Sequence, residues 1–208
     1  MFRALISVSD KTGLHVLGKG LVDRFGGDLM IISTGGTCKA LEAEKISVMK
    51  IESITGVPEV MDGRVKTIHP KIAGGILAKR DNPKHMQQLE EVLRAGTIDL
   101  VVVNLYPFAK AAANPHTSFN ELIEEIDIGG PTLLRAAAKN FRDVIVIVDP
   151  VDYERLLEQL AQPGGPTLGY RFEMMKKVFR LTHHYDGDIV ETLDEFHINA
   201  DKFYRCPT

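Results

Sequence analysis

Five short apolar runs alternate with segments of helical period, and this alternation limits the folds open to the chain. The runs are rich in Val, Ile and Leu, which is typical of strands covered by helices on both faces of a sheet. They occupy residues 4–9, 29–33, 47–51, 98–104 and 144–149. Helical patterns occupy 13–25, 36–44, 83–95, 117–125, 130–138, 151–161 and 168–193. This order predicts an α/β fold: a doubly wound, mainly parallel sheet with right-handed crossovers and helices on both faces.

The length of 208 residues suits one such domain with a short appendage. We expect the domain to span 1–193 and a C-terminal tail, which shows no clear period, to span 194–208. The pattern is less regular over 52–82, and AKAAANPHTS (109–118) is predicted to be a surface loop.

Charge and cysteine content narrow the classes of partner. The chain has 25 basic and 28 acidic side chains, a net charge of −3, so no global positive field would attract nucleic acid. Its two cysteines, Cys38 and Cys206, form neither a disulfide framework nor a zinc-binding spacing. The N-terminus begins a strand rather than a signal peptide, and no apolar run approaches the roughly 18 residues that span a bilayer. We therefore expect a cytoplasmic protein without nucleic-acid or membrane partners.

Two hydroxyl-rich turns follow the first two predicted strands. SVSDKTG (7–13) holds Ser9 and Lys11, and STGGT (33–37) places two glycines at a helix start. Each turn has a structural interpretation, as a helix cap or a tight strand–helix turn. Helix N-termini and close backbone approach at glycine also favour anions. Because open α/β sheets bind ligands at the carboxyl ends of their strands, the pair favours a phosphate site.

Two further stretches are polar at positions suited to a site. DGRVKTIHPKIAGG (62–75) contains Arg64, Lys66, His69 and Lys71, and is either a solvated basic loop or, given its small residues, a shaped binding loop. NLYPF (104–108) ends the predicted strand 98–104. Its Tyr106 either packs with the hydroxyl in water or donates a hydrogen bond to a ligand.

The stretch IDIGGPTLLRAAAKN (126–140) puts Asp127 in a glycine turn and Lys139 at the far end of a helix. Pro131 suits the first helical turn. Asp127 as a capping acid and Lys139 as a cation at a helix C-terminus are the structural interpretations. A helix from Pro131 to Lys139 is roughly 12–13 Å long, so both charges meet one ligand only if the helix is short or the ligand is long.

In this order, SVSDKTG, STGGT, GRVKTIHPK, NLYPF and IDIGGPTLLRAAAKN resemble the inosine monophosphate (IMP) cyclohydrolase domain, the N-terminal half of a bifunctional enzyme of purine biosynthesis. The resemblance covers residues 4 to about 193 and implies a methylglyoxal-synthase-like fold. It implies dehydrative ring closure of 5-formamidoimidazole-4-carboxamide ribonucleotide (FAICAR) to IMP, the last step of de novo purine biosynthesis. It also implies a nucleotide substrate, no metal or cofactor, and a homodimer.

The resemblance assigns roles by position. Catalytic positions match Lys66, Tyr106, Asp127 and Lys139. Positions at the ribose-phosphate end match Ser7, Ser9, Lys11, Thr34, Gly35, Gly36, Thr37, Arg64 and Thr67, and positions near the base match Asn104, Ile128 and Gly129.

The chain departs from the family pattern in three ways. Phe141 stands where a histidine is common, and THHYD (182–186) replaces a threonine–alanine pair before the tyrosine. The transformylase half is absent, so we expect a stand-alone cyclohydrolase or one domain of a larger protein, with a separate formyl-transferring enzyme supplying its substrate. Alternatives are a methylglyoxal-synthase-like lyase and a nucleotide-sensing regulatory module of the same fold.

Overall fold

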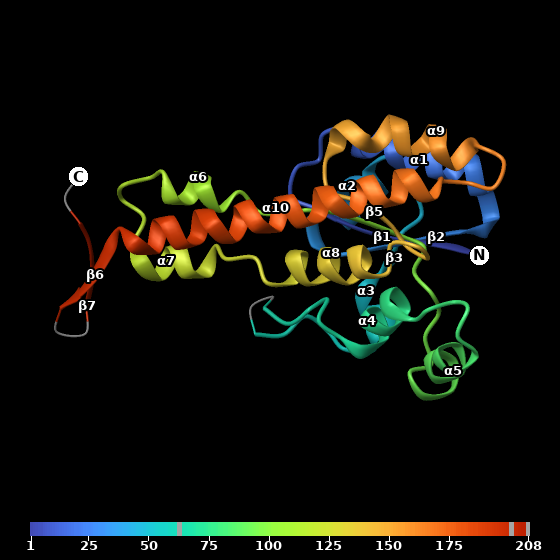
Figure 1. Ribbon diagram of the computed structural model, residues 1–208, viewed down its shortest axis with the longest axis horizontal. Coiled ribbons are helices and arrows are strands. Elements are labelled where there is room, and N and C mark those ends of the chain that lie inside the picture. The colour runs from blue at the N-terminus through green and yellow to red at the C-terminus, as the bar shows by residue number, and fades with distance from the viewer. Residues whose placement is uncertain (62–63, 200–201, 207–208) are drawn as a thin grey trace.

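The computed structural model describes residues 1–61, 64–199 and 202–206. Its central feature is a five-stranded sheet of order β3-β2-β1-β4-β5 in which all neighbours are parallel. These strands are β1 (Phe2–Val8), β2 (Leu29–Ser33), β3 (Met49–Lys50), β4 (Leu100–Asn104) and β5 (Ile145–Ile147). The sheet lies among the helices in Figure 1, and the predicted α/β fold with a parallel sheet is confirmed.

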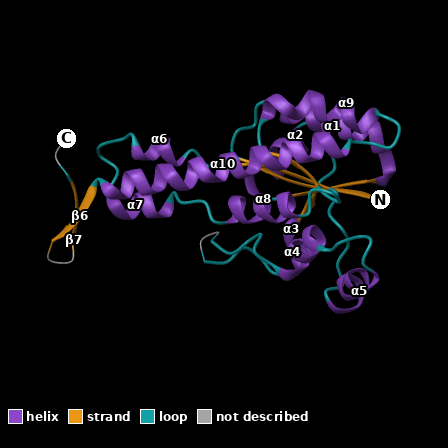
Figure 2. Cartoon of the chain, viewed as in Figure 1, coloured by secondary structure: helices purple, strands orange, loops and turns teal. Residues whose placement is uncertain are grey.

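The order reverses direction after β1, so the crossovers place helices on both faces. The helices between the strands are α1 (Leu14–Phe25), α2 (Gly35–Ala43), α3 (Ile51–Thr55), α4 (Pro70–Leu77), α5 (Pro83–Gln87), α6 (Phe108–Ala112), α7 (Phe119–Glu124) and α8 (Gly129–Lys139). After β5 come α9 (Tyr153–Ala161) and α10 (Leu168–Asp194), and short helical turns are η1 (Gly26–Asp28), η2 (Gln88–Val92) and η3 (Pro150–Asp152). α1 packs with α2 and α9, and α8 packs with α4 and α10 (Figure 2).

The core is made from the strands themselves. Leu5 and Ile6 are neighbours on β1 that point to opposite faces, and both are fully buried. Val101 and Val102 on β4 are buried in the same way. Burial of successive residues explains why the strands lack an alternating pattern. Within the described ranges, no helix combines the length and apolarity needed to cross a membrane.

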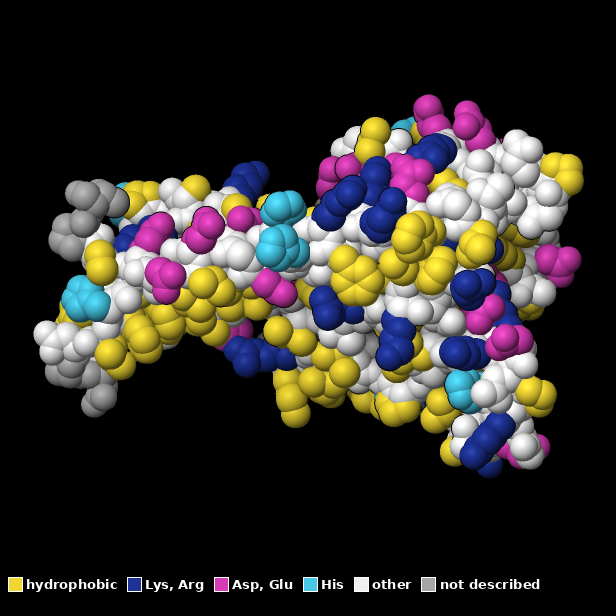
Figure 3. Space-filling view, viewed as in Figure 1, with side chains coloured by type: hydrophobic (Ala, Val, Ile, Leu, Met, Phe, Trp, Pro, Cys, Tyr) yellow, Lys and Arg dark blue, Asp and Glu magenta, His cyan; other side chains and the backbone are white. Residues whose placement is uncertain are grey.

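One end of α10 extends beyond the sheet as an arm (Figure 1). α6 and β6 (Phe196–Asn199) pack on α10 there, and α7 packs on α6. β6 pairs antiparallel with β7 (Lys202–Arg205), and Phe119 of α7 stacks on Phe203 at a centroid distance of 3.8 Å. Figure 3 shows hydrophobic side chains along the lower edge of this arm.

Three predicted segments differ from the structure. The single helix predicted over 83–95 is α5 followed by the π-helical turn η2. The predicted loop 109–118 contains most of α6. The tail 194–208, predicted without regular structure, contains the β6–β7 pair, with residues 200–201 and 207–208 outside the described part of the chain.

Two helical glycines, one in α4 and one in α10, test how closely these helices are packed. A Cβ atom on Gly75 would lie 2.7 Å from the backbone oxygen of Gly96, so Gly75→Ala should destabilise the fold by about 1–3 kcal/mol. A Cβ on Gly187 of α10 would meet nothing within 4 Å, so Gly187→Ala should stabilise by about 0.5–1 kcal/mol. Urea unfolding measures both. Shifts of the same sign in the two variants would contradict the packing described.

Candidate active site at the carboxyl edge of the sheet

The reversal of strand order lies between β1 and β4, whose carboxyl ends are side by side. Val8 at the end of β1 is in register with Asn104 at the end of β4. Open parallel sheets form their ligand crevice at such a switch point, because the connections leave it in opposite directions. The predicted site residues Ser7, Ser9 and Asn104 all lie here.

Asn104 ties the two strand ends together. Its Oδ1 accepts hydrogen bonds from the backbone N–H groups of Ser9, at 2.6 Å, and Asp10, at 3.0 Å. Its Nδ2 donates to the carbonyl of Asp10 at 3.1 Å. The hydroxyl of Ser9 lies 2.9 Å from Asn104 Oδ1 and 2.8 Å from the carbonyl of Leu105. The Asn104 amide, which the resemblance assigns to a position near the nucleotide base, therefore already makes the hydrogen bonds that shape the loop.

The start of α2 forms the neighbouring part of the edge. Gly35 has a φ of 44°, in the left-handed region that favours glycine. The N–H groups of Thr37 and Cys38 bond back to the carbonyl of Thr34, whereas those of Gly35 and Gly36 make no hydrogen bond within the described residues. Two free N–H groups at a helix N-terminus make a favourable place for an anion.

Hydroxyl groups join β1 to this helix start. Ser7 Oγ lies 3.2 Å from Thr34 Oγ1. The hydroxyl of Thr37 donates to the carbonyl of Val8 at 2.9 Å and accepts from its N–H at 3.1 Å. Ser7, Thr34, Gly35, Gly36 and Thr37 are thus one cluster, as the sequence predicts, although Thr37 is a buried brace between α2 and β1.

Lys66 reaches the same cluster from the segment before α4. A Cβ atom on Gly35 would lie 3.4 Å from Lys66 Nζ, so the ammonium group is beside the helix start. Lys66 Nζ also forms a salt bridge of 3.0 Å with Glu59. Thr67 faces α8, because a Cβ atom on Gly129 would lie 3.0 Å from its Oγ1. Of the stretch 62–75, Asp62 and Gly63 lie outside the described residues.

Asp127 is a half-buried carboxylate surrounded by backbone donors. Its Oδ1 accepts from the N–H of Gly130 at 2.9 Å, and the N–H groups of Tyr106 and Gly129 also point at the carboxylate. Burial raises the pKa of Asp127, and these three donors partly offset that rise. The N–H groups of the glycine turn are therefore directed at Asp127 itself.

Other predicted residues sit at the rim of the site. The Tyr106 side chain is 60% exposed, and its hydroxyl makes no hydrogen bond with the described residues. Ile128 is also 60% exposed, at the N-cap of α8. Lys11 Nζ folds back on the carbonyls of Val8 and Ser9, and burial lowers the pKa of this lysine. Arg64 points away and pairs with Glu124 of α7.

Lys139 is not brought to Asp127 within one chain. α8 runs from Gly129 to Lys139, so at 1.5 Å per residue the lysine lies about 13 Å along the axis from Gly130. Lys139 instead lines a cavity of about 400 Å³ with Phe141 and Phe179. No salt bridge joins Lys139 to any described carboxylate.

Two contacts were missed by sequence reasoning. Glu59 holds Lys66, and no pattern in residues 52–61 marks it out. The hydroxyl of Tyr185 accepts a 2.8 Å hydrogen bond from the N–H of Asp127. Tyr185 belongs to THHYD, and its spacing within a helical pattern is that of a core residue, so nothing in the sequence marked it as a contact of Asp127. Both residues orient a predicted site residue.

The edge therefore offers a helix start suited to an anion with a lysine beside it, a half-buried carboxylate with a raised pKa, and an exposed phenol. Such a set can bind the phosphate of a ligand and exchange a proton with its other end.

Comparison with known proteins shows which families and proteins the chain is similar to. Residues 17–132 match the MGS-like domain family, and residues 137–206 match the AICARFT/IMPCHase bienzyme family. The bifunctional purine biosynthesis protein PurH of Acetivibrio thermocellus is 51% identical over 201 residues, which are 97% of this chain and 38% of that protein. PurH of Bacillus mycoides is 52% identical over 185 residues, 89% of this chain and 35% of that protein.

Among solved structures, the crystal structure of ForH is similar with a TM-score of 0.78 and 33% sequence identity, covering 92% of this chain and 98% of that one. The chain spans 38% and 35% of the two curated relatives described above.

The raised pKa of Asp127 predicts a pH dependence of stability. Since the folded state binds this proton more tightly than the unfolded chain does, the free energy of unfolding should fall as pH rises from 3.8, the ordinary aspartate value, through the pKa of folded Asp127. Asp127→Asn should remove that fall. Urea unfolding at a series of pH values measures it, and the carboxyl ¹³C shift of Asp127 gives the pKa directly.

Asp10 is the matched control. Hydrogen bonds from the side chain and backbone of Thr12 lower the pKa of Asp10, so its contribution has the opposite sign and is lost as pH falls. Identical pH profiles for the wild type and Asp127→Asn would show that Asp127 titrates normally.

Proposed function

Because the chain belongs to the family of MGS-like domains and also matches the AICARFT/IMPCHase bienzyme family, we propose that it is an IMP cyclohydrolase. It closes the ring of FAICAR to give IMP and water in purine biosynthesis. The observation that carries this proposal is the half-buried Asp127, which backbone donors hold beside Tyr106, on the same edge as the anion-binding start of α2. The names of the curated relatives support the pathway.

The phosphate of the substrate binds at the start of α2. The N–H groups of Gly35 and Gly36 donate to it, and Ser7, Ser9 and Thr34 supply hydroxyl groups around it. Lys66 adds positive charge on the same side. Thr67 and the exposed Ile128 flank the path from there to Asp127. Lys11 and Arg64 complete this end only if their side chains leave their present partners.

Ring closure needs a nucleophile, an electrophile and a path for the departing oxygen. Holding the carboxamide nitrogen against the formyl carbon supplies much of the acceleration. As the N–C bond forms, Asp127 takes the amide proton. Tyr106 donates a hydrogen bond to the oxygen that gains negative charge, and Lys66 does so once its side chain turns from Glu59 and the start of α2 toward this end. The C–O bond then breaks as the formamide nitrogen loses its proton and forms the C=N bond, and the two protons removed from the nitrogens leave with the oxygen as water. The raised pKa of Asp127 makes its carboxylate a stronger base than an exposed aspartate.

Lys139 acts at Asp127 from a second copy of the chain, because helix α8 separates the two residues within one copy. This assignment rests on the proposed homodimer. We also place the protein in the cytoplasm, with a separate formyl-transferring enzyme or a further domain supplying FAICAR.

A methylglyoxal-synthase-like lyase would consume dihydroxyacetone phosphate, and a regulatory module would consume neither that compound nor FAICAR. The cyclohydrolase is favoured because a carboxylate with a raised pKa lies beside the Tyr106 backbone, on the same sheet edge as the start of α2.

Turnover tests the proposal. The chain, given FAICAR without added metal, should form IMP, followed by absorbance. Asp127→Asn should lower kcat by about 10²–10⁴, the usual contribution of a general base, with little change in affinity for IMP. Lys66→Met should raise KM as well as lower kcat, since it faces the phosphate site.

Lys84 is the matched control for Lys66. It is an exposed lysine of α5, and Lys84→Met should leave both constants unchanged. A folded sample without turnover, or Asp127→Asn at the wild-type rate, would contradict the proposal.

Mixed dimers test the origin of Lys139. Asp127→Asn and Lys139→Met should each be inactive alone. If each site combines Asp127 of one copy with Lys139 of the other, co-refolding equal amounts restores one intact site in each mixed dimer. Half of the dimers are then mixed, so about a quarter of the wild-type activity should return. No recovery in a sample shown to contain mixed dimers would mean that Lys139 does not act across the interface.

A further inference from the structure

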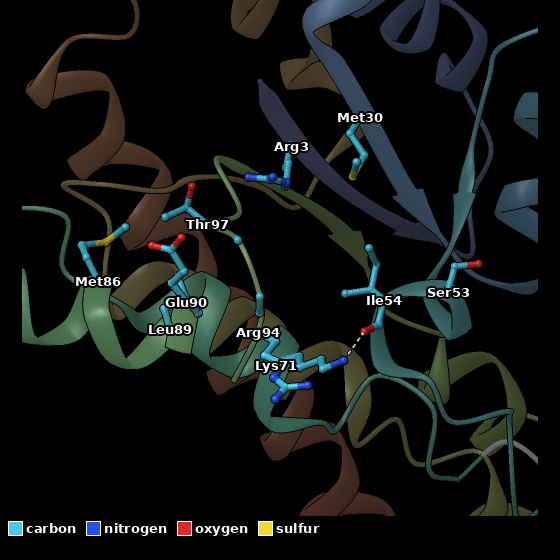
Figure 4. A pocket seen from close by; sticks show the side chains of 12 residues that line it. Arg3, Met30, Ser53, Ile54, Lys71, Met86, Leu89, Glu90, Arg94 and Thr97 are labelled. Atoms are coloured by element: carbon cyan, nitrogen blue, oxygen red, sulfur yellow. Dashed lines mark hydrogen bonds between the residues drawn. The ribbon is translucent and has the colours of Figure 1, made fainter. Parts of the chain in front are cut away.

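A cleft of about 670 Å³ lies at the amino end of the sheet, on the edge opposite the candidate active site (Figure 4). Arg3 near the start of β1, Met30 near the start of β2 and Thr97 before β4 line it. This volume is within the range of small-molecule sites. We call it the amino-edge cleft.

Three cations and one carboxylate line the amino-edge cleft: Arg3, Lys71, Arg94 and Glu90. In the described parts of the chain, none of the three cations forms a salt bridge. Lys71 Nζ donates to the carbonyl of Ile54 at 3.0 Å, the dashed line in Figure 4. Like charges around one cleft repel each other unless an anion sits among them. The cleft is therefore electrostatically suited to a ligand of negative charge.

The backbone that presents Arg94 is unusual in two ways. η2 is a π-helical turn, in which the N–H of Leu93 bonds to the carbonyl of Gln88 at 3.1 Å. Arg94 then has a φ of 50°, a left-handed conformation that costs a non-glycine residue about 1–2 kcal/mol. π-turns and such strained residues recur at functional sites. Here they form the wall of the cleft and place Arg94 at its lining.

Gly96 gives Arg3 its place in the cleft. A Cβ atom on Gly96 would lie 2.5 Å from Arg3 Nη1 and 2.6 Å from its Cζ. The guanidinium group therefore lies directly against the Gly96 backbone, in space that any other residue would fill. Gly96 needs no left-handed φ, so this close approach is the local reason for a glycine.

We propose that the amino-edge cleft binds a small organic phosphate. Two guanidinium groups and an ammonium group suit a phosphate dianion, which arginine binds through paired N–H donors. Met30, Ile54 and Leu89 offer apolar surface to the rest of the ligand, and Glu90 accepts its N–H or O–H groups.

The cleft adjoins the loop of the candidate active site through α4. His69 caps this helix by accepting a hydrogen bond of 3.2 Å from the N–H of Lys71, and Thr67 lies two residues before it. Lys71 thus links the cleft to the segment that bears Lys66.

The test is a titration of the ¹⁵N-labelled chain with adenosine 5′-monophosphate, inorganic phosphate and adenosine. The amide signals of Ala95, Gly96 and Thr97 should shift saturably with the nucleotide, more weakly with phosphate and not with adenosine. Signals of Gly35 and Gly36 report the candidate active site separately, so the result does not depend on turnover.

Variants connect the shifts to the cleft. The double variant Arg3→Met, Arg94→Met should weaken the Kd at the cleft by about tenfold or more, because the cleft loses two of its three cations. Arg180→Met, at an exposed arginine of α10, is the matched control and should change it less than about twofold. Gly96→Ala should also weaken binding, since its Cβ displaces Arg3 while every charge is kept.

Three results would overturn the proposal: no saturable shift at residues 95–97, shifts confined to Gly35 and Gly36, or an unchanged Kd in the folded double variant. Equal affinity for phosphate and nucleotide would overturn the assignment of an organic ligand.

Discussion

The side chain of Asn104 is the constraint on which the site depends. Parallel strands leave their carboxyl ends with unpaired backbone groups, and β1 and β4 send their connections in opposite directions. Asn104 meets both demands, because one amide group accepts from the N–H groups of Ser9 and Asp10 and donates back to the Asp10 carbonyl. The loop after β1 is thereby held against the end of β4, and the loop after β4 brings Tyr106 toward Asp127. This tie adds to the backbone pairing of β1 with β4 and fixes the loop after β1 relative to the loop after β4.

The two edges of the sheet offer different chemical groups to an anion. At the carboxyl edge, the start of α2 offers backbone N–H groups and a helix dipole, with one lysine beside them. At the amino edge, long cationic side chains surround a cleft whose wall is a strained, π-helical turn. Backbone donors are fixed in place and suit a site where a substrate must be held in one pose. Side-chain cations adapt to the ligand, which suits binding alone.

Much of the fold follows from local pattern, and what was missed depends on distant contacts. The five strands are continuous apolar runs, and burial on both faces is the physical reason. α6 was taken for a loop because Asn114 and Pro115 follow its alanines. The β6–β7 pair owes its order to Phe119 of α7, which stacks on Phe203 from 84 residues away. The π-turn η2 has the same apolar spacing as an α-helix, so periodicity does not reveal it.

The candidate site also has features that follow from local sequence and features that only the folded chain shows, and helix α8 is the clearest example. Its length was predictable, and so was the separation of Asp127 from Lys139. The structural interpretations of Asp127 as a capping acid and of Lys139 as a cation at a helix C-terminus both hold. A carboxylate at the N-terminus and a lysine at the C-terminus each interact favourably with the helix dipole. For Asp127, the dipole and three backbone donors lower the pKa while burial raises it, and burial prevails. The sequence alone does not give this balance of effects on the pKa, because the balance depends on the glycine turn, on Tyr106 and on the neighbouring helices that bury Asp127. Burial therefore raises the proton affinity of the Asp127 carboxylate, while the hydrogen bond from Gly130 fixes its orientation.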